Sequence, residues 1–257
     1  MATLFNAMLE TARLAGVLVG GKTTAQLNAD YFYDTNRWEP DGYFNNGTVF
    51  ILSGSVNLNN TRRVISYKHV NGEFYCETFD GTIVQGTLYN VTNAHREALV
   101  SAVNNALVQM GEYVEIEDTA TILTGAQELV LPAGVSNVLR IEYAGSRKFR
   151  IGNWREINGK ILFGWGFDTA PSEPIRIYYL KNHPQVYNDN DIINPNYNLK
   201  RLAWTAAYMY LLDRMQYAGN ADDKEQFLLQ NAQQMAQRLA LQFPVRQLER
   251  DPILARY

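Results

Sequence analysis

The feature that most constrains this chain is a segment at residues 202–212, LAWTAAYMYLL, that is apolar on nearly every side. A helix of this composition has no polar face to expose, so it must be enclosed all round by its own chain or by neighbouring copies. The segment has about half of the roughly 20 apolar residues that a membrane-spanning helix needs. We therefore interpret it as the buried helix of a soluble protein.

A second helix with a narrower apolar seam follows. Gly219 separates the two helices, Asp222 and Asp223 place negative charge at the N-terminus of the second, and Pro244 ends it. Its seam consists of Leu228, Ala232, Met235, Leu239 and Phe243, opposite a face of Gln226, Gln230, Gln233 and Gln237. The seam and the preceding apolar helix together predict packing between neighbouring subunits.

Two helices are predicted earlier in the chain. Thr3 is a candidate N-cap for a short helix that the Gly20-Gly21 pair ends. Asn93 is the candidate N-cap of a clearer helix, which Gly111 ends. Its apolar side chains recur at helical spacing: Leu99, Ala102, Val103, Ala106, Leu107 and Met110.

The remaining apolar segments are short and typical of strands. The Asn71-Gly72 pair between two of them is a strong hairpin signal. The first set of predicted strands comprises residues 47–52, 63–67, the two arms of this hairpin and 87–89. The second set comprises residues 128–132, 139–143, 149–151, 161–163 and 175–179. Their spacing indicates two antiparallel sheets.

We therefore expect an α+β fold with a helical core, inserted antiparallel β-sheets and an extended C-terminal tail. The core is predicted to hold the N-terminal helix, the central helix and the two C-terminal helices. The predicted divisions are a core of residues 1–22, 93–111 and 196–244, a first β insertion of residues 23–92, a second β-rich region of residues 112–195, and a docking tail of residues 245–257.

Reactive chemistry is not indicated by the sequence. The chain has 257 residues, of which 46% are hydrophobic, with a net charge of −3, values that argue against disorder and against gripping nucleic acid through many phosphates. Cys76 is the only cysteine, and His69, His95 and His183 have no ligand or triad partner at motif spacing. We predict no enzymatic activity, no cofactor and no metal site.

Two polar segments leave alternatives open. Residues 188–191, NDND, offer oxygens for Ca²⁺ but lack the glycine and distal glutamate of a calcium loop, so a solvated connecting loop is favoured. Residues 30–44 mix aromatic and acidic side chains. Packing or an interface is favoured there over a sugar-binding surface of Tyr31, Tyr33, Trp38 and Tyr43, or a hydrolase cleft of Asp30, Asp34, Glu39 and Asp41.

The end of the chain has the composition of a docking segment. After Pro244, arginines alternate with large apolar side chains, which suits an extended segment that binds a groove on a partner. The predicted docking residues are Arg246, Leu248, Arg250, Ile253, Leu254, Arg256 and Tyr257. The predicted subunit-packing residues are Leu202, Trp204, Tyr208, Leu211, Leu228, Met235, Leu239 and Phe243.

An ordered series of motifs extends over nearly the whole chain, roughly residues 1–245. It comprises YFNNGTVFI at residues 43–51, RVISY at 63–67, TLY at 87–89, EALVSAVNNAL at 97–107, VLPAGV at 130–135, and the late helix with Trp204, Ala206, Ala207, Leu211 and Leu212. This series resembles the head-to-tail adaptor, or neck, proteins of tailed bacteriophages. The chain departs from the family pattern at Val103, where isoleucine is usual, and over residues 168–198.

The resemblance implies a virion structural protein, assembled in the host cytoplasm and located where the head meets the tail. It implies a homo-oligomeric ring, of twelve copies in this family. Its partners would be the portal protein on one side and a tail, nozzle or second neck protein on the other. DNA would pass through the ring without being read, and no membrane is involved. A baseplate or tail-attachment subunit, and a glycan-binding module for host recognition, are the alternatives.

Overall fold

The computed structural model describes residues 1–26, 28–54, 56–121, 128–131, 135–143, 150–164, 174–218 and 222–245. They form two compact units. Unit 1 comprises residues 1–110 and 185–244, and unit 2 is built from residues 111–184.

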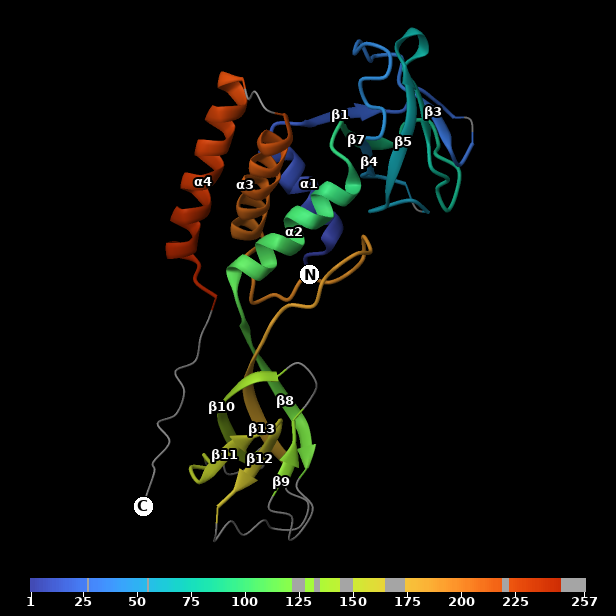
Figure 1. The fold of residues 1–257 in the computed structure, drawn as a ribbon. Coiled ribbons are helices and arrows are strands. Elements are labelled where there is room, and N and C mark those ends of the chain that lie inside the picture. Colours follow the sequence, from blue (N-terminus) through green and yellow to red (C-terminus); the bar gives the residue numbers. More distant parts are fainter. Residues whose placement is uncertain are drawn as a thin grey trace. The chain divides into compact units, whose positions relative to one another are not determined.

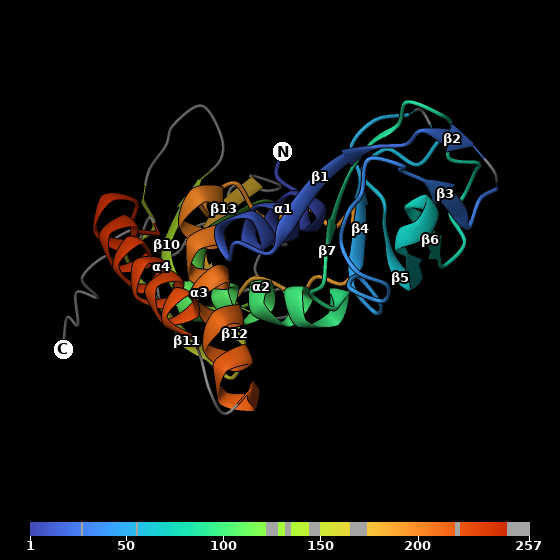
Figure 2. The ribbon, with the colours of Figure 1, turned by 90° about the horizontal axis from the view of Figure 1, so that it is seen from above.

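The helical layer of unit 1 contains α1 (Leu4–Leu14), α2 (Arg96–Met110), α3 (Leu199–Ala218) and α4 (Asp223–Gln242). The apolar helix α3 contacts the other three, which explains how one chain encloses so much of it (Figures 1 and 2). Side chains fix the two ends predicted from the sequence: Thr3 accepts a hydrogen bond from the Asn6 amide, and Asp222 accepts one from the Glu225 amide.

The second part of unit 1 is a curled antiparallel sheet. It contains β1 (Leu18–Lys22), β2 (Ala25–Gln26), β3 (Tyr31–Tyr33), β4 (Thr48–Ile51), β5 (Thr61–Lys68), β6 (Glu73–Cys76) and β7 (Leu88–Thr92). The strand order is β1-β7-β4-β5-β6-β3-β2. The first and last strands in this order are joined by Thr23 and Thr24 alone. The sheet therefore curls into a half-barrel that brings its two edge strands, β1 and β2, close together (Figure 2).

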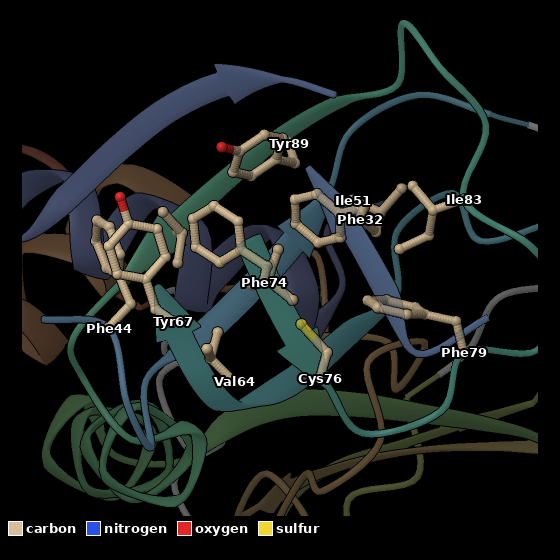
Figure 3. Close-up of a cluster of buried hydrophobic side chains, with 12 residues drawn as sticks. Phe32, Phe44, Ile51, Val64, Tyr67, Phe74, Cys76, Phe79, Ile83 and Tyr89 are labelled. Carbon is tan, nitrogen blue, oxygen red and sulfur yellow. The ribbon is translucent and has the colours of Figure 1, made fainter. Parts of the chain in front are cut away.

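Aromatic side chains fill the inside of this half-barrel. Phe74 of β6 lies opposite Phe32 of β3 and Tyr67 of β5 in register, so all three point inward from one row. The Phe32 and Phe74 rings stack with centroids 4.9 Å apart (Figure 3). The buried cluster comprises Phe32, Phe44, Val49, Ile51, Val64, Tyr67, Phe74, Cys76, Phe79, Ile83, Tyr89 and Val91.

Unit 2 consists of two three-stranded antiparallel sheets. One has the order β10 (Val135–Tyr143), β13 (Pro174–Lys181), β8 (Tyr113–Thr121), and the other β11 (Trp154–Ile157), β12 (Lys160–Phe163), β9 (Glu128–Val130). Apolar side chains of both sheets share one core: Val138, Ile141, Ile151, Trp154, Ile161, Phe163, Ile175, Ile177 and Tyr179. The unit therefore has a hydrophobic core of its own.

The predicted α+β fold with a helical core and inserted sheets is wrong. Helix and strand take nearly equal shares, 32% and 31%, and the sheets are not insertions into a dominant helical body. The physical reason is that the half-barrel curls around an aromatic core of its own, so it is a full part of unit 1 and not a sheet inserted into a helical body. The predicted tail, residues 245–257, lies outside the described residues except for Val245.

Candidate interaction surface

Helix α4 is the outermost element of the helical layer. It contacts α3, and only Ala232 and Leu239 of its twenty residues are buried. Phe227 and Leu241 are 66% and 86% exposed. They are 14 positions apart, which places them on one outward stripe about 21 Å apart along the axis. The inner face of α4 is therefore packed, while its outer face carries large apolar groups in solvent.

The predicted subunit-packing residues divide by burial. Leu202, Leu211 and Leu239 are buried within the chain itself. Four are half-buried: Trp204, Tyr208, Leu228 and Met235. Phe243 is 43% exposed. The half-buried and exposed residues retain surface that another copy can cover, whereas the buried three contact only their own chain.

A groove lies between α1 and α3, with Met235 of α4 at its edge. It has a volume of about 450 Å³ and is lined by α1, α3 and α4 through Glu10, Arg13, Leu14, Leu199, Lys200, Ala203, Trp204 and Met235. Arg13 is paired with Glu10 at 2.6 Å, so these two charges neutralise one another. Lys200 is exposed, and the described residues provide no ion-pair partner for it. The groove is thus apolar, with one unpaired cation at its rim.

Arg201 stabilises the C-terminal end of α4. Its guanidinium donates a hydrogen bond of 2.9 Å to the Phe243 carbonyl, the C-cap residue of α4. A cation at this position also suits the negative end of the helix dipole. Burial lowers the pKa of Arg201 from its ordinary value. Arg201 also lines a smaller pocket of about 330 Å³ between α2, α3 and α4.

Three of the four acidic residues considered for a hydrolytic cleft, Asp34, Glu39 and Asp41, are held by protein donors. Asp34 is buried and accepts hydrogen bonds from the Tyr89 hydroxyl at 2.8 Å and from Arg37 Nε at 3.2 Å. Arg37 also pairs with Glu39 at 3.3 Å and donates to the Gly20 carbonyl. Both carboxylates are thus held by one guanidinium inside the fold. Asp41 is exposed and accepts a hydrogen bond from the His69 amide.

The aromatic residues of the same region do not form a flat platform. Tyr31 and Tyr33 meet edge to face, with centroids 5.0 Å apart and planes at 67°. Their hydroxyls share a hydrogen bond of 2.6 Å, which raises the pKa of Tyr31. This geometry disagrees with the coplanar rings that a sugar-binding surface predicts. Trp38 and Tyr43, however, are 79% and 46% exposed.

The loop at residues 188–191 is not merely solvated. Asp189 accepts hydrogen bonds from the Thr61 amide and from Arg96, and Asp191 accepts them from the Tyr187 and Asn188 amides. The two carboxylates are therefore occupied by protein donors. Within the described ranges, no group of three or more histidine, cysteine or acidic side chains is arranged to hold a metal ion.

The other residues considered for chemistry are the cysteine and the three histidines. Cys76 is buried, and burial raises the pKa of its thiol. His69 and His95 are exposed, and the His183 ring lies 6.3 Å from that of Tyr113. The predicted docking residues Arg246, Leu248, Arg250, Ile253, Leu254, Arg256 and Tyr257 fall outside the described residues. In the part of the chain that is described, no helix has the length and apolar character of a membrane span.

Sequence reasoning missed three polar residues that organise unit 1: Arg37, Thr61 and Arg96. Arg37 had a usable signal, since it lies between Asp34 and Glu39 in an aromatic segment. Thr61 and Arg96 had no such signal in the sequence, because their partner Asp189 is distant along the chain. Comparison with known proteins adds no family: no protein-family model matches the chain, and no curated protein is significantly similar to it.

Proposed function

We propose that this protein is a non-enzymatic structural subunit of a virus particle that forms an adaptor ring between the head and tail of a tailed bacteriophage. The observation that carries the proposal is α4, a 20-residue helix with a packed inner face and exposed Phe227 and Leu241 on its outer face. In this proposal a neighbouring copy covers both side chains. The ordered motif series supplies the virion setting.

The polar clusters of the described residues support a structural role. Asp34, Glu39 and Asp189 are each engaged by arginine, and Asp191 by backbone amides. Such groups stabilise a fold, whereas general acid–base catalysis needs a titratable group within reach of a bound substrate. The adaptor role requires rigid units that hold their partners, and these ion pairs provide that rigidity.

In this proposal the copies associate side by side into a ring, through which DNA passes without sequence recognition. The portal protein binds one side, and a tail, nozzle or second neck protein binds the other. The segment at residues 246–257, with its arginines and apolar residues, is proposed to dock into the portal. The chain's net charge of −3 suits a conduit that does not retain DNA.

The decisive experiment is to locate the protein in intact particles by electron cryo-microscopy. We expect density for a ring of copies between the portal and the tail. Density at the baseplate would replace the adaptor role with that of a tail-attachment subunit, and absence from the particle would overturn the proposal.

A second experiment tests the docking segment. Removal of residues 246–257 should leave the circular dichroism spectrum unchanged and abolish co-purification with the portal protein. The matched control replaces the three arginines of the segment with lysine, which keeps the charge and the length. Unchanged portal binding by the truncated chain would exclude docking through this segment.

A further inference from the structure

Trp38 is the most unusual surface residue of unit 1. Tryptophan is highly buried on average, yet Trp38 is 79% exposed. It lies in the loop between β3 and β4, at the half-barrel end of the unit. A single exposed apolar residue needs no explanation by itself, so the argument depends on how its backbone is held.

The two neighbours of Trp38 anchor it from both sides. The side chains of Arg37 and Glu39 are only 12% and 7% exposed, and they pair with each other at 3.3 Å. The Trp38 amide donates a hydrogen bond to Glu39, and Arg37 is tied to Asp34. Since both neighbours point inward, the indole between them projects outward from a fixed backbone. A rigid exposed aromatic group loses little entropy on binding, which is typical of interface hot spots.

The groove beside α4 has the properties that an indole requires. Its volume of about 450 Å³ is that of a small-molecule site. Its walls include Leu14, Leu199, Ala203, Trp204 and Met235. Trp204 and Met235 provide an aromatic face and a thioether, both of which pack favourably against another aromatic ring.

The Trp38 loop and the rim of the groove carry complementary charges. Asp41 lies three positions after Trp38, is exposed, and has no ion-pair partner among the described residues. Lys200 at the rim of the groove is likewise exposed and unpaired within the described part of the chain. Docking of the Trp38 loop in the groove would bring this anion and cation together, which favours one orientation of the two copies.

We propose that Trp38 of one copy of this chain inserts into the α1–α3–α4 groove of the next copy, with Asp41 beside Lys200. Within unit 1, α4 lies at the end of the helical layer away from the half-barrel (Figures 1 and 2). The projecting residue and the groove are therefore on different parts of the same unit. Such a contact is heterologous, and it continues from copy to copy until a ring closes or a filament forms.

This inference deepens the proposed function and rests on it, but its test uses the purified full chain alone. We expect concentration-dependent assembly in mass photometry and sedimentation velocity. Trp38→Ala should weaken self-association, raising its Kd on the order of tenfold or more. Val70→Ala is the matched control, because Val70 is 84% exposed on the same half-barrel, and it should assemble like the unchanged chain. A chain that stays monomeric, or Trp38→Ala assembling normally, overturns the contact.

A charge exchange and a cross-link test the direction of the contact. Lys200→Glu should weaken assembly, and adding Asp41→Lys should restore it. Mild oxidation of Asp41→Cys mixed with Lys200→Cys should give disulfide-linked pairs, whereas either variant alone should give none; Cys76 is buried and does not interfere. Cross-linking of Asp41→Cys to itself would overturn the head-to-tail arrangement. If neither the charge exchange nor the cross-link gives the expected result while the protein is still found at the neck of the particle, this contact is excluded and the proposed function stands.

Discussion

Arg96 and Asp189 form an ion pair of 2.8 Å across 93 positions of the sequence. Asp189 also accepts hydrogen bonds from the amide and the hydroxyl of Thr61, and its carbonyl accepts one from the Phe5 amide. Arg96 begins α2, Thr61 begins β5, and Phe5 is in the first turn of α1. One loop residue therefore fixes the starts of two helices and one strand. It also compensates the unfavourable placement of a cation at the N-terminus of α2.

Replacement of Arg96 tests the importance of this pair. Arg96→Met should lower the free energy of unfolding by about 1–3 kcal/mol, because the Asp189 carboxylate, 11% exposed, loses its charged partner. Arg13→Met is the control: it removes an exposed pair with Glu10 on α1 and should cost roughly 0.5 kcal/mol or less. Urea unfolding monitored by tryptophan fluorescence measures both. Equal losses would mean that the Arg96 pair is no more stabilising than a surface pair.

Loss of the hydroxyl should lower the free energy of unfolding at one tyrosine of the half-barrel core but not at another. Tyr89 donates to Asp34 at 2.8 Å, so Tyr89→Phe should cost about 1–3 kcal/mol in the free energy of unfolding. The buried Tyr67 hydroxyl has no hydrogen-bond partner among the described residues, so Tyr67→Phe should be neutral or stabilising by about 1 kcal/mol. Chemical unfolding of the two variants provides the comparison. A larger loss for Tyr67→Phe would contradict this assignment.

The helices were predictable because helical periodicity is a local property. Gly111 follows the end of α2 as expected, but the helix begins at Arg96, so the predicted N-cap Asn93 lies two residues before the N-cap position. The same local logic failed at the Gly20-Gly21 pair, which was predicted to end a helix but lies inside β1. The reason is not local: Gly21 lies against Tyr89 and Asp34, which come from other strands and loops.

The fold class could not be predicted because closure of a sheet is a non-local property. The sequence indicated strands at residues 47–52 and 63–67, near β4 and β5. It did not indicate that β1 and β2, which are adjacent in the sequence, lie at opposite edges of the sheet. For the candidate surface, the apolar seam of α4 could be predicted from the helical spacing of its residues. The exposure of Trp38 could not be predicted, because it follows from the inward direction of the Arg37 and Glu39 side chains.

The loop that carries Asp189 also gives a pH dependence. Hydrogen bonds from the Tyr187 and Asn188 amides lower the pKa of Asp191 from its ordinary value of 3.8. A carboxyl with a lowered folded-state pKa adds stability above pH 3.8, and that stability is lost as the pH falls through the folded-state pKa. Asp191→Asn should therefore be less stable than the unchanged chain at pH 7, and the difference should shrink below pH 3.8. Urea midpoints from pH 7 to pH 2.5 measure this, and a constant difference would exclude the mechanism.

Gly21 is where β1 meets the buried cluster, and it offers the sharpest test of the half-barrel. A Cβ at this position would lie 2.5 Å from Tyr89 Cζ and 2.6 Å from Asp34 Oδ2. Gly21→Ala should therefore displace either β1 or the Tyr89–Asp34 hydrogen bond and cost about 1–3 kcal/mol in the free energy of unfolding. At Gly152 an added Cβ meets nothing within 4 Å, so Gly152→Ala should change the stability by less than about 0.5 kcal/mol.

The clash at Gly21 involves the Tyr89 ring and the Asp34 carboxylate, and removal of the ring should relieve part of it. In a Tyr89→Leu background the ring that the new methyl group meets is absent, and Gly21→Ala should then cost less than in the unchanged chain. Residues in contact show such non-additivity, whereas independent sites do not. A double-mutant cycle from urea unfolding gives the coupling directly. Full additivity would mean that β1 does not lie over Tyr89, and the strand order that closes the half-barrel would then be incorrect.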